Sequence, residues 1–138
     1  MKKVREIYKE RVKWVFKDYP LRIHKEAELA AEAARCAGDQ GRFWEYQERL
    51  YGAGGDLAPA RLKDYAAELG LDAKALAQCL DEKKYEETIK QDMAEGKRVG
   101  LDRLPSFVIG GKLISGSMTL ERFQELIDED LKRVHGGP

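Results

Sequence analysis

The chain has 138 residues, of which 36% are charged, and its 25 basic and 25 acidic side chains cancel to a formal net charge of zero. This length suits one domain with its own hydrophobic core and is short for two. The two signs are mixed along the sequence, which excludes the basic face that a nucleic-acid-binding protein needs. No run of about 18 apolar residues is present that could span a membrane.

The start of the chain predicts the end of a helix followed by a strand. Residues 2–10 are mostly charged, with apolar side chains at helical spacing, and no capping residue begins this helix. Arg11 to Lys17 then alternates before turning apolar, which predicts a buried strand that stops at Asp18-Tyr19-Pro20. No apolar segment follows the charged start, so we expect no signal peptide in the chain as given.

A block of helices is predicted from Ile23 to Gly100. Alanine-rich or amphipathic stretches, each followed by a residue that ends or caps a helix, divide this block. The predicted helices span residues 26–37, 42–51, 56–69, 73–80 and 82–99, the last being the longest. Asp56 and Asp72 are the expected caps of the third and fourth helices.

The remainder predicts a β-hairpin and a closing helix. Residues 107–109 and 113–114 are strand-like, and the two glycines between them suit a tight turn, because glycine reaches positive φ at little cost. Pro105 stands at the start of the first strand, where its missing N–H need not break a ladder bond. Thr119 can cap an amphipathic helix that runs to Val134. A strand, a helical block, a hairpin and a last helix predict an α/β layer fold, and this order resembles the latter half of a thioredoxin-type fold.

Four stretches carry a more specific resemblance. They are residues 12–21, 30–46, 65–72 and 100–116. In this order, and over nearly the whole chain, they resemble the DsbA-like thiol–disulfide oxidoreductases of the thioredoxin superfamily. The resemblance implies an α/β, thioredoxin-like fold in a single domain over residues 1–138, with a helical insertion at about residues 23–100. It implies no cofactor, and as partner an extended polypeptide substrate or a thiol protein.

The resemblance also implies a substrate-binding position. Pro105 matches the family's cis-proline, which faces the active-site disulfide. Leu104 matches the residue before that proline, whose backbone pairs with an extended substrate peptide. An X-Pro bond is kept in the cis form only where the turn geometry demands it.

The sequence departs from the family where the redox chemistry should begin. The family's first core strand and its Cys-x-x-Cys motif are expected just before Met1, and neither is present in the chain as given. We therefore expect an N-terminally truncated fold, without its first core strand, that is redox-inactive alone. That strand would lie between residues 12–16 and residues 107–109, so its loss would expose strand edges. The family is usually exported, but this chain shows no export signal, so its localisation stays open.

Two cysteines, Cys36 and Cys79, are separated by 43 positions and cannot form a Cys-x-x-Cys pair. Three interpretations remain open. They form a redox pair, they are two buried free thiols, or they form a structural disulfide between two helices of the insertion, as related proteins have. With His24 and His135 as the only histidines, we do not expect a metal site.

The functional prediction is membership of the DsbA-like thiol–disulfide oxidoreductase family in a chain without its redox motif. One alternative is a non-catalytic module, peptide-binding or chaperone-like, that keeps the groove at Leu104 and Pro105. A further alternative is a homodimer in which a second copy supplies the missing strand.

Overall fold

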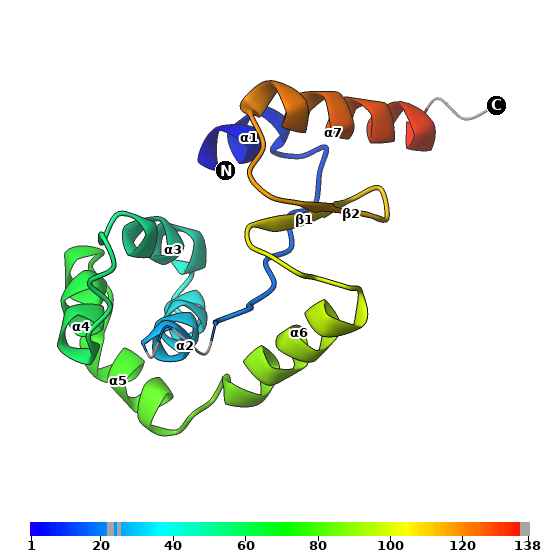
Figure 1. Cartoon of the computed structure of the whole chain (residues 1–138). Coiled ribbons are helices and arrows are strands. Elements are labelled where there is room, and N and C mark those ends of the chain that lie inside the picture. The colour runs from blue at the N-terminus through cyan, green and yellow to red at the C-terminus, as the bar shows by residue number, and fades with distance from the viewer. Residues whose placement is uncertain (22–23, 25, 136–138) are drawn as a thin grey trace. The chain divides into compact units, whose positions relative to one another are not determined.

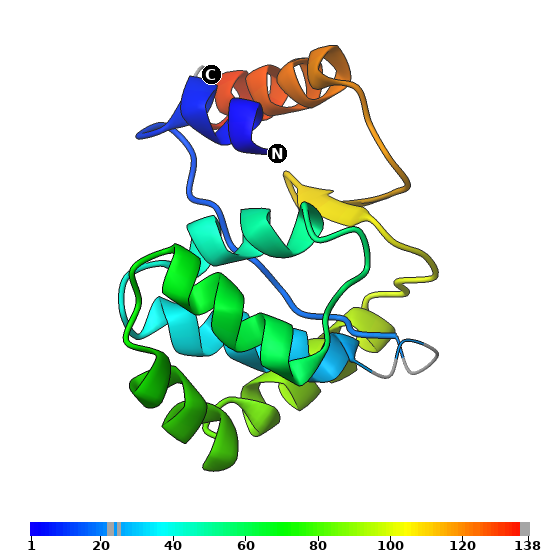
Figure 2. The same cartoon turned by 90° about the vertical axis from the view of Figure 1, so that its left-hand side faces the viewer.

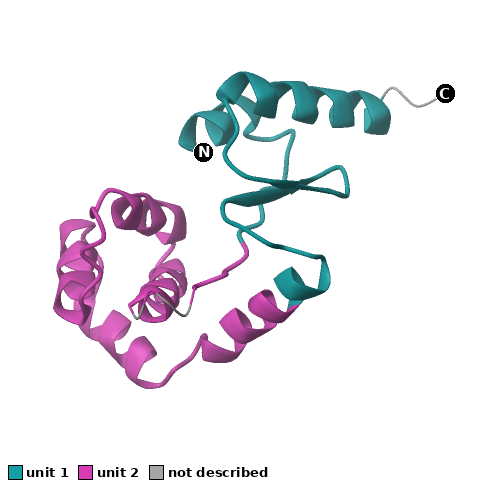
Figure 3. Ribbon diagram, in the orientation of Figure 1, with its two compact units in different colours: residues 1–16, 95–138 teal, residues 17–94 magenta. Residues whose placement is uncertain are grey.

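The computed structural model describes residues 1–21, 24 and 26–135, which form seven helices and a two-stranded sheet (Figure 1). The chain divides into two compact units (Figure 3). We call residues 17–94 the helical unit. We call residues 1–16, together with the chain from residue 95 onward, the hairpin unit.

The helical unit contains four complete helices and most of a fifth. These are α2 (Ala27–Gly38), α3 (Phe43–Tyr51), α4 (Pro59–Glu68), α5 (Ala73–Asp81) and α6 (Glu86–Arg98), whose last turn belongs to the hairpin unit. The predicted helices at 26–37, 42–51, 56–69 and 73–80 are confirmed, with ends that differ by no more than three residues. The predicted start of the insertion, Ile23, lies outside the described residues.

The core of the helical unit is built on the alanine face of α2. Ala33, Ala34 and Ala37 are fully buried, and their small side chains let α2 lie close to α3, α4 and α5. Large side chains from the other helices fill the remaining space. Among them Tyr46 is fully buried, and its hydroxyl donates a 2.7 Å hydrogen bond to the backbone oxygen of Leu62. That bond removes the cost of burying the phenol oxygen without a partner.

The two predicted caps have different outcomes. The side chain of Asp72 accepts hydrogen bonds from the backbone N–H groups of Lys74 and Ala75, as an N-cap residue does, so this prediction is confirmed. The prediction for Asp56 is wrong. Helix α4 begins at Pro59 without a side-chain cap, because a proline at the first helical position already removes one of the unpaired N–H groups that a cap would satisfy.

The helix predicted over residues 82–99 begins later than expected. Lys83 has φ 53°, in the left-handed region, so the backbone leaves the helical path there and α6 begins only at Glu86. Helix α6 therefore has 13 residues, and within the described chain α7 is longer, with 16. The prediction that residues 82–99 form the longest helix is wrong.

The hairpin unit combines two helices with the sheet. Its complete elements are α1 (Lys2–Tyr8), β1 (Ser106–Ile109), β2 (Lys112–Ser115) and α7 (Leu120–His135). The strands are antiparallel, and Ile109 pairs with Lys112 across the Gly110-Gly111 turn. Both glycines have positive φ, 58° and 79°, which the two-residue hairpin turn requires. The predicted hairpin is confirmed. So is the closing helix, whose cap Thr119 accepts from the N–H of Arg122.

Helices α1 and α7 lie beside each other and share the core of the hairpin unit (Figures 1 and 2). Val4 and Tyr8 of α1 are buried with Phe123 of α7, and Phe107 of β1 packs edge-to-face on Phe123 at 4.7 Å between ring centroids. The hydroxyl of Tyr8 donates a 2.7 Å hydrogen bond to Asp128. Burial and this bond to a carboxylate raise the pKa of Tyr8 to about 12.

The prediction of a strand over Arg11 to Lys17 is wrong. Residues 12–17 alternate between partly buried and exposed, as in an extended chain, but no β-bridge joins them to another strand in the described part of the molecule. A hydrophobic pattern fixes which side chains face inward, whereas a strand also needs a hydrogen-bonded neighbour. Val12 and Trp14 use the inward positions to pack on the core of the hairpin unit.

No helix in the described ranges is both long and apolar enough to cross a membrane. The single domain predicted over residues 1–138 stays a prediction beside the two compact units.

Candidate functional site

The first candidate site is the turn that leads into β1. The peptide bond between Leu104 and Pro105 is cis. Hydrogen bonds hold this turn on both sides. The N–H of Gly116 donates to the backbone oxygen of Pro105 at 2.7 Å, and the hydroxyl of Ser106 donates to the backbone oxygen of Arg103. The turn is therefore fixed by its neighbours, while Leu104 stays 45% exposed.

The edge of β1 continues this exposed surface. Since the turn has two residues, Ile109 and Lys112 form a hydrogen-bonded pair, and such pairs alternate along the strand. The backbone N–H and C=O groups of Ser106 and Val108 therefore point away from β2. The sheet has only two strands within the described residues, so this edge has no strand beside it. Val108 is 62% exposed.

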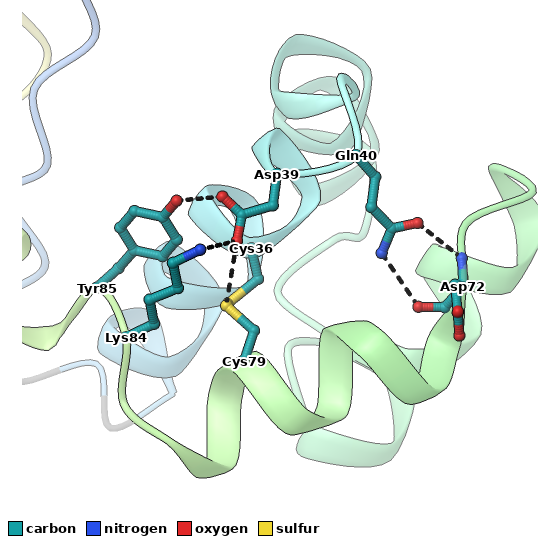
Figure 4. The surroundings of a disulfide bond; sticks show 7 residues. All are labelled: Cys36, Asp39, Gln40, Asp72, Cys79, Lys84 and Tyr85. Carbon is teal, nitrogen blue, oxygen red and sulfur yellow. Dashed lines mark hydrogen bonds and ion pairs between the residues drawn. A yellow bond between two sulfur atoms is a disulfide. The ribbon is translucent and has the colours of Figure 1, made fainter.

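The second candidate site is a disulfide between Cys36 and Cys79, with Cα atoms 5.9 Å apart (Figure 4). The disulfide that the resemblance implied is thus present, and it joins α2 to α5 within the helical unit. Each cysteine lies two residues before the end of its helix. The 138-residue sequence has no other cysteine, so this bond uses both of its thiols.

Asp39, the residue that follows α2, lies against this disulfide (Figure 4). Its Oδ2 is 3.9 Å from Cys79 Sγ. The contact is not a hydrogen bond, because a disulfide sulfur carries no hydrogen. Lys84 Nζ donates to the same oxygen at 2.8 Å, and the Tyr85 hydroxyl donates to Oδ1. These two hydrogen bonds hold the pKa of Asp39 below its ordinary value, so its carboxylate is ionised at neutral pH.

A buried ion cluster lies elsewhere in the helical unit. Arg35 of α2 donates to Asp18 Oδ2 at 2.7 Å and to Asp92 Oδ2 of α6 at 3.3 Å. Lys17 Nζ lies 3.8 Å from Asp92, and the Arg35 guanidinium stacks over the Phe43 ring at 4.8 Å. Burial raises the pKa of Asp18 above its ordinary value, although the hydrogen bond from Arg35 acts in the opposite direction. The cluster binds three distant segments together.

Sequence reasoning found the turn and the disulfide but not the residues around them. Leu104 and Pro105 are neighbours in the chain and lie in the hairpin unit, whereas Cys36 and Cys79 lie in the helical unit. Their roles in binding and in structure stay predictions. Asp39 and the Asp18 cluster were missed. One feature of the sequence could have indicated Asp39. It lies three residues after Cys36, at the C-terminal end of a helix, where an acidic residue is unfavourable unless it has a partner.

Comparison with known proteins shows the family. A family model described as thioredoxin matches residues 1–129. The chain therefore belongs to the thioredoxin family. Its seven helices and small sheet, counted over the described residues, agree with the predicted α/β, thioredoxin-like fold, which is confirmed. Thioredoxin-like domains are typical of thiol–disulfide oxidoreductases, and the family match supports this broad class for the chain.

Curated relatives carry a different kind of name. The chain is 34% identical over 111 residues to a protein of Salinispora arenicola named Na(+)/H(+) antiporter NhaA 1, a match that covers 80% of the chain and 17% of that protein. Antiporter NhaA 3 of Salinispora tropica is 32% identical over the same shares. Antiporter NhaA of Herminiimonas arsenicoxydans is 32% identical over 68% of the chain and 15% of that protein. The chain spans about a sixth of the length of these relatives.

Proposed function

We propose that this chain is a DsbA-like member of the thiol–disulfide oxidoreductase family that binds extended polypeptides at the Leu104–Pro105 turn. We further propose that its own two cysteines carry out no disulfide exchange. The observation that supports binding is the exposed edge of β1, where the backbone groups of Ser106 and Val108 point away from β2. Ion transport is not part of the proposal, since the similarity to the antiporters covers about a sixth of their length.

The chemistry of the edge defines the ligand. Alternating N–H and C=O groups along a strand pair with another extended backbone, which adds a strand to the sheet. Leu104 and Val108 lie beside this edge as exposed apolar side chains. An extended segment with apolar side chains at alternate positions would pair with Ser106 and Val108 and cover both side chains. Such a ligand is an unfolded stretch of protein.

A binding measurement tests this assignment. The probe is reduced, carboxymethylated α-lactalbumin carrying a fluorescent label, which is an unfolded polypeptide without free thiols. We expect saturable binding in fluorescence anisotropy. Val108→Pro removes an outward N–H and should weaken binding about fivefold. Leu104→Ser removes an apolar contact and should weaken it about tenfold.

The matched control is Val108→Thr, which keeps the backbone donor and should bind within about twofold of the original chain. Thermal unfolding of every variant shows that the hairpin is intact. Equal affinity of all four proteins for the probe would contradict the binding site. The redox part is tested by insulin reduction with the chain alone, and turnover that requires Cys36 or Cys79 would contradict it.

A second candidate function is self-association through the same edge. The free edge of β1 supports it, because an unpaired strand edge is a template for another copy. Light scattering separates the candidates. A dimer that dissociates in Val108→Pro supports edge pairing between copies, whereas a monomer that binds the probe supports polypeptide binding.

A further inference from the structure

The two sulfurs of the disulfide occupy helix positions that oppose thiolate formation. Cys36 and Cys79 both lie in the last turn of their helices, α2 and α5. Unpaired carbonyl groups give that end of a helix a partial negative charge. Thiols that take part in exchange lie instead where positive charge lowers the thiol pKa, as at a helix N-terminus. Reduction of this bond must therefore release a thiolate into an unfavourable environment.

Burial selects which sulfur an external thiol attacks. Cys79 is 8% exposed and Cys36 is 2% exposed. An incoming thiolate therefore bonds to Cys79 Sγ, and the sulfur–sulfur bond breaks to release Cys36 as a thiolate, which takes up a proton. A second thiolate then attacks the mixed disulfide and leaves Cys79 reduced. In total two external thiols are oxidised to a disulfide, and the protein disulfide gains two electrons and two protons.

Asp39 places a negative charge beside the sulfur under attack. Its Oδ2 lies 3.9 Å from Cys79 Sγ, and Lys84 and Tyr85 hold the carboxylate there. A thiolate that approaches Cys79 is repelled by this charge. A charge this close to the attacked sulfur acts on the thiolate even in a high dielectric, and the Lys84 cation at 2.8 Å from the same carboxylate oxygen offsets part of the repulsion.

We propose that Asp39 shields the Cys36–Cys79 disulfide from thiolates, so that this bond is a lasting cross-link of the helical unit and not a second exchange centre. The carboxylate charge repels thiolates at the sulfur of Cys79, the more exposed cysteine. The partial negative charge at the helix end makes the Cys36 thiolate a poorer leaving group. This inference rests on the geometry of the helical unit and not on the proposed polypeptide site.

The experiment measures how fast thiols of different charge reduce the folded protein. The probes are 2-mercaptoethanesulfonate, which is anionic, 2-mercaptoethanol, which is neutral, and cysteamine, which is cationic. Newly formed protein thiols are trapped with a maleimide and counted by mass. Each rate constant is divided by the thiolate fraction of its probe. We expect cysteamine to react fastest and 2-mercaptoethanesulfonate slowest, with a difference that narrows at high salt.

Two substitutions give opposite expected results. Asp39→Asn removes the negative charge and should speed the reaction with 2-mercaptoethanesulfonate about fivefold. Lys84→Gln leaves the carboxylate without its cation and should slow the same reaction. A change that merely loosened the fold would speed reduction in both variants, so the opposite signs separate shielding from destabilisation.

The matched control is Asp81→Asn. This exposed carboxylate lies two residues after Cys79 on the same helix, and side chains at that spacing do not face each other. It should change each rate by less than about twofold. Equal corrected rates with all three probes in the original chain would overturn the proposal. So would faster reduction by every probe in both Asp39→Asn and Lys84→Gln.

Discussion

The backbone N–H of Asp18 donates a 2.9 Å hydrogen bond to Oδ2 of Asp92, 74 positions further along the chain. Arg35 bonds to both carboxylates. The first residues of the helical unit, its first helix and its last helix are therefore joined at one buried point. A cluster of this kind holds the two ends of the unit together and depends on the presence of all its members.

Removal of the Arg35 cation, which the two carboxylates share, should lower the free energy of unfolding. Arg35→Met leaves the buried Asp18 without its charge partner and leaves Asp92 with the more exposed Lys17 at 3.8 Å, and we expect a loss of about 3 kcal/mol in the free energy of unfolding. Urea denaturation measures it. The matched control is Lys90→Met, which breaks the exposed pair between Lys90 and Glu86 at 3.0 Å and should change stability little. Similar losses in both variants would contradict a special role for the buried cluster.

The raised pKa of Asp18 predicts a pH dependence with a definite sign. Burial raises this pKa above its ordinary value of 3.8, so the folded chain binds the proton more tightly than the unfolded chain does. The contribution of Asp18 is most favourable below the unfolded pKa and is lost as pH rises through the folded pKa.

A comparison with Asp18→Asn isolates this contribution. The difference in unfolding free energy, original chain minus variant, should fall as pH rises above about 4. Urea titrations at several pH values measure the difference. A difference that rises with pH would mean that the hydrogen bond from Arg35 outweighs burial.

The disulfide should stabilise the helical unit strongly. It closes a loop of 43 positions, and restricting the unfolded chain by such a loop is worth about 4 kcal/mol in the chain-entropy model. The double variant Cys36→Ala with Cys79→Ala should lose about that amount in urea denaturation. The free thiols of the unfolded original chain, counted with and without reductant, provide the check. The same count in both conditions would show that the bond does not form.

Alanine substitutions at the two glycines of the hairpin turn should differ in their effect on stability. A Cβ at Gly110 would lie 2.5 Å from Asp130 Oδ1, whereas a Cβ at Gly111 meets nothing within 4 Å. Both positions have positive φ, so each alanine substitution carries a backbone cost of about 1 kcal/mol. Gly110→Ala should be the more destabilising, because Asp130 also accepts two hydrogen bonds from Arg133 and resists moving.

A second substitution tests the cause. Adding Asp130→Ala to Gly110→Ala removes the close contact and should bring the loss down to that of Gly111→Ala. Thermal unfolding measures all three proteins. A double variant no more stable than Gly110→Ala alone would show that the carboxylate is not responsible.

Local chemistry predicted the elements whose causes are local. The Gly110-Gly111 turn, the Asp72 cap and the Thr119 cap depend on residues within a few positions of one another. The prediction of a strand at Arg11 to Lys17 was wrong because the alternation of apolar and polar residues does not show whether a neighbouring strand is present. The predicted start of α6 was wrong because the backbone is left-handed at Lys83, and such a conformation is usually indicated in a sequence by a glycine.

The candidate site was predictable only in part, for the same reason. Leu104, Pro105 and the two cysteines came from a family resemblance that covers most of the chain. Arg35, Asp18 and Asp92 are single charges in a sequence with 50 charged residues, and nothing local distinguishes them from exposed ones. Asp39 gains its importance from Cys79, Lys84 and Tyr85, which lie at least 40 positions away. Such partners become visible only in the folded chain.

The division into two units also assigns each unit its own optical reporter. Of the two tryptophans in the sequence, Trp14 belongs to the hairpin unit and Trp44 to the helical unit. Trp14 packs against the core around Phe123, and Trp44 meets Phe43 edge-to-face at 5.2 Å between ring centroids. The emission of each indole therefore changes when its own unit melts. Proteins that keep one tryptophan each would show whether the units melt as a single cooperative block or in succession.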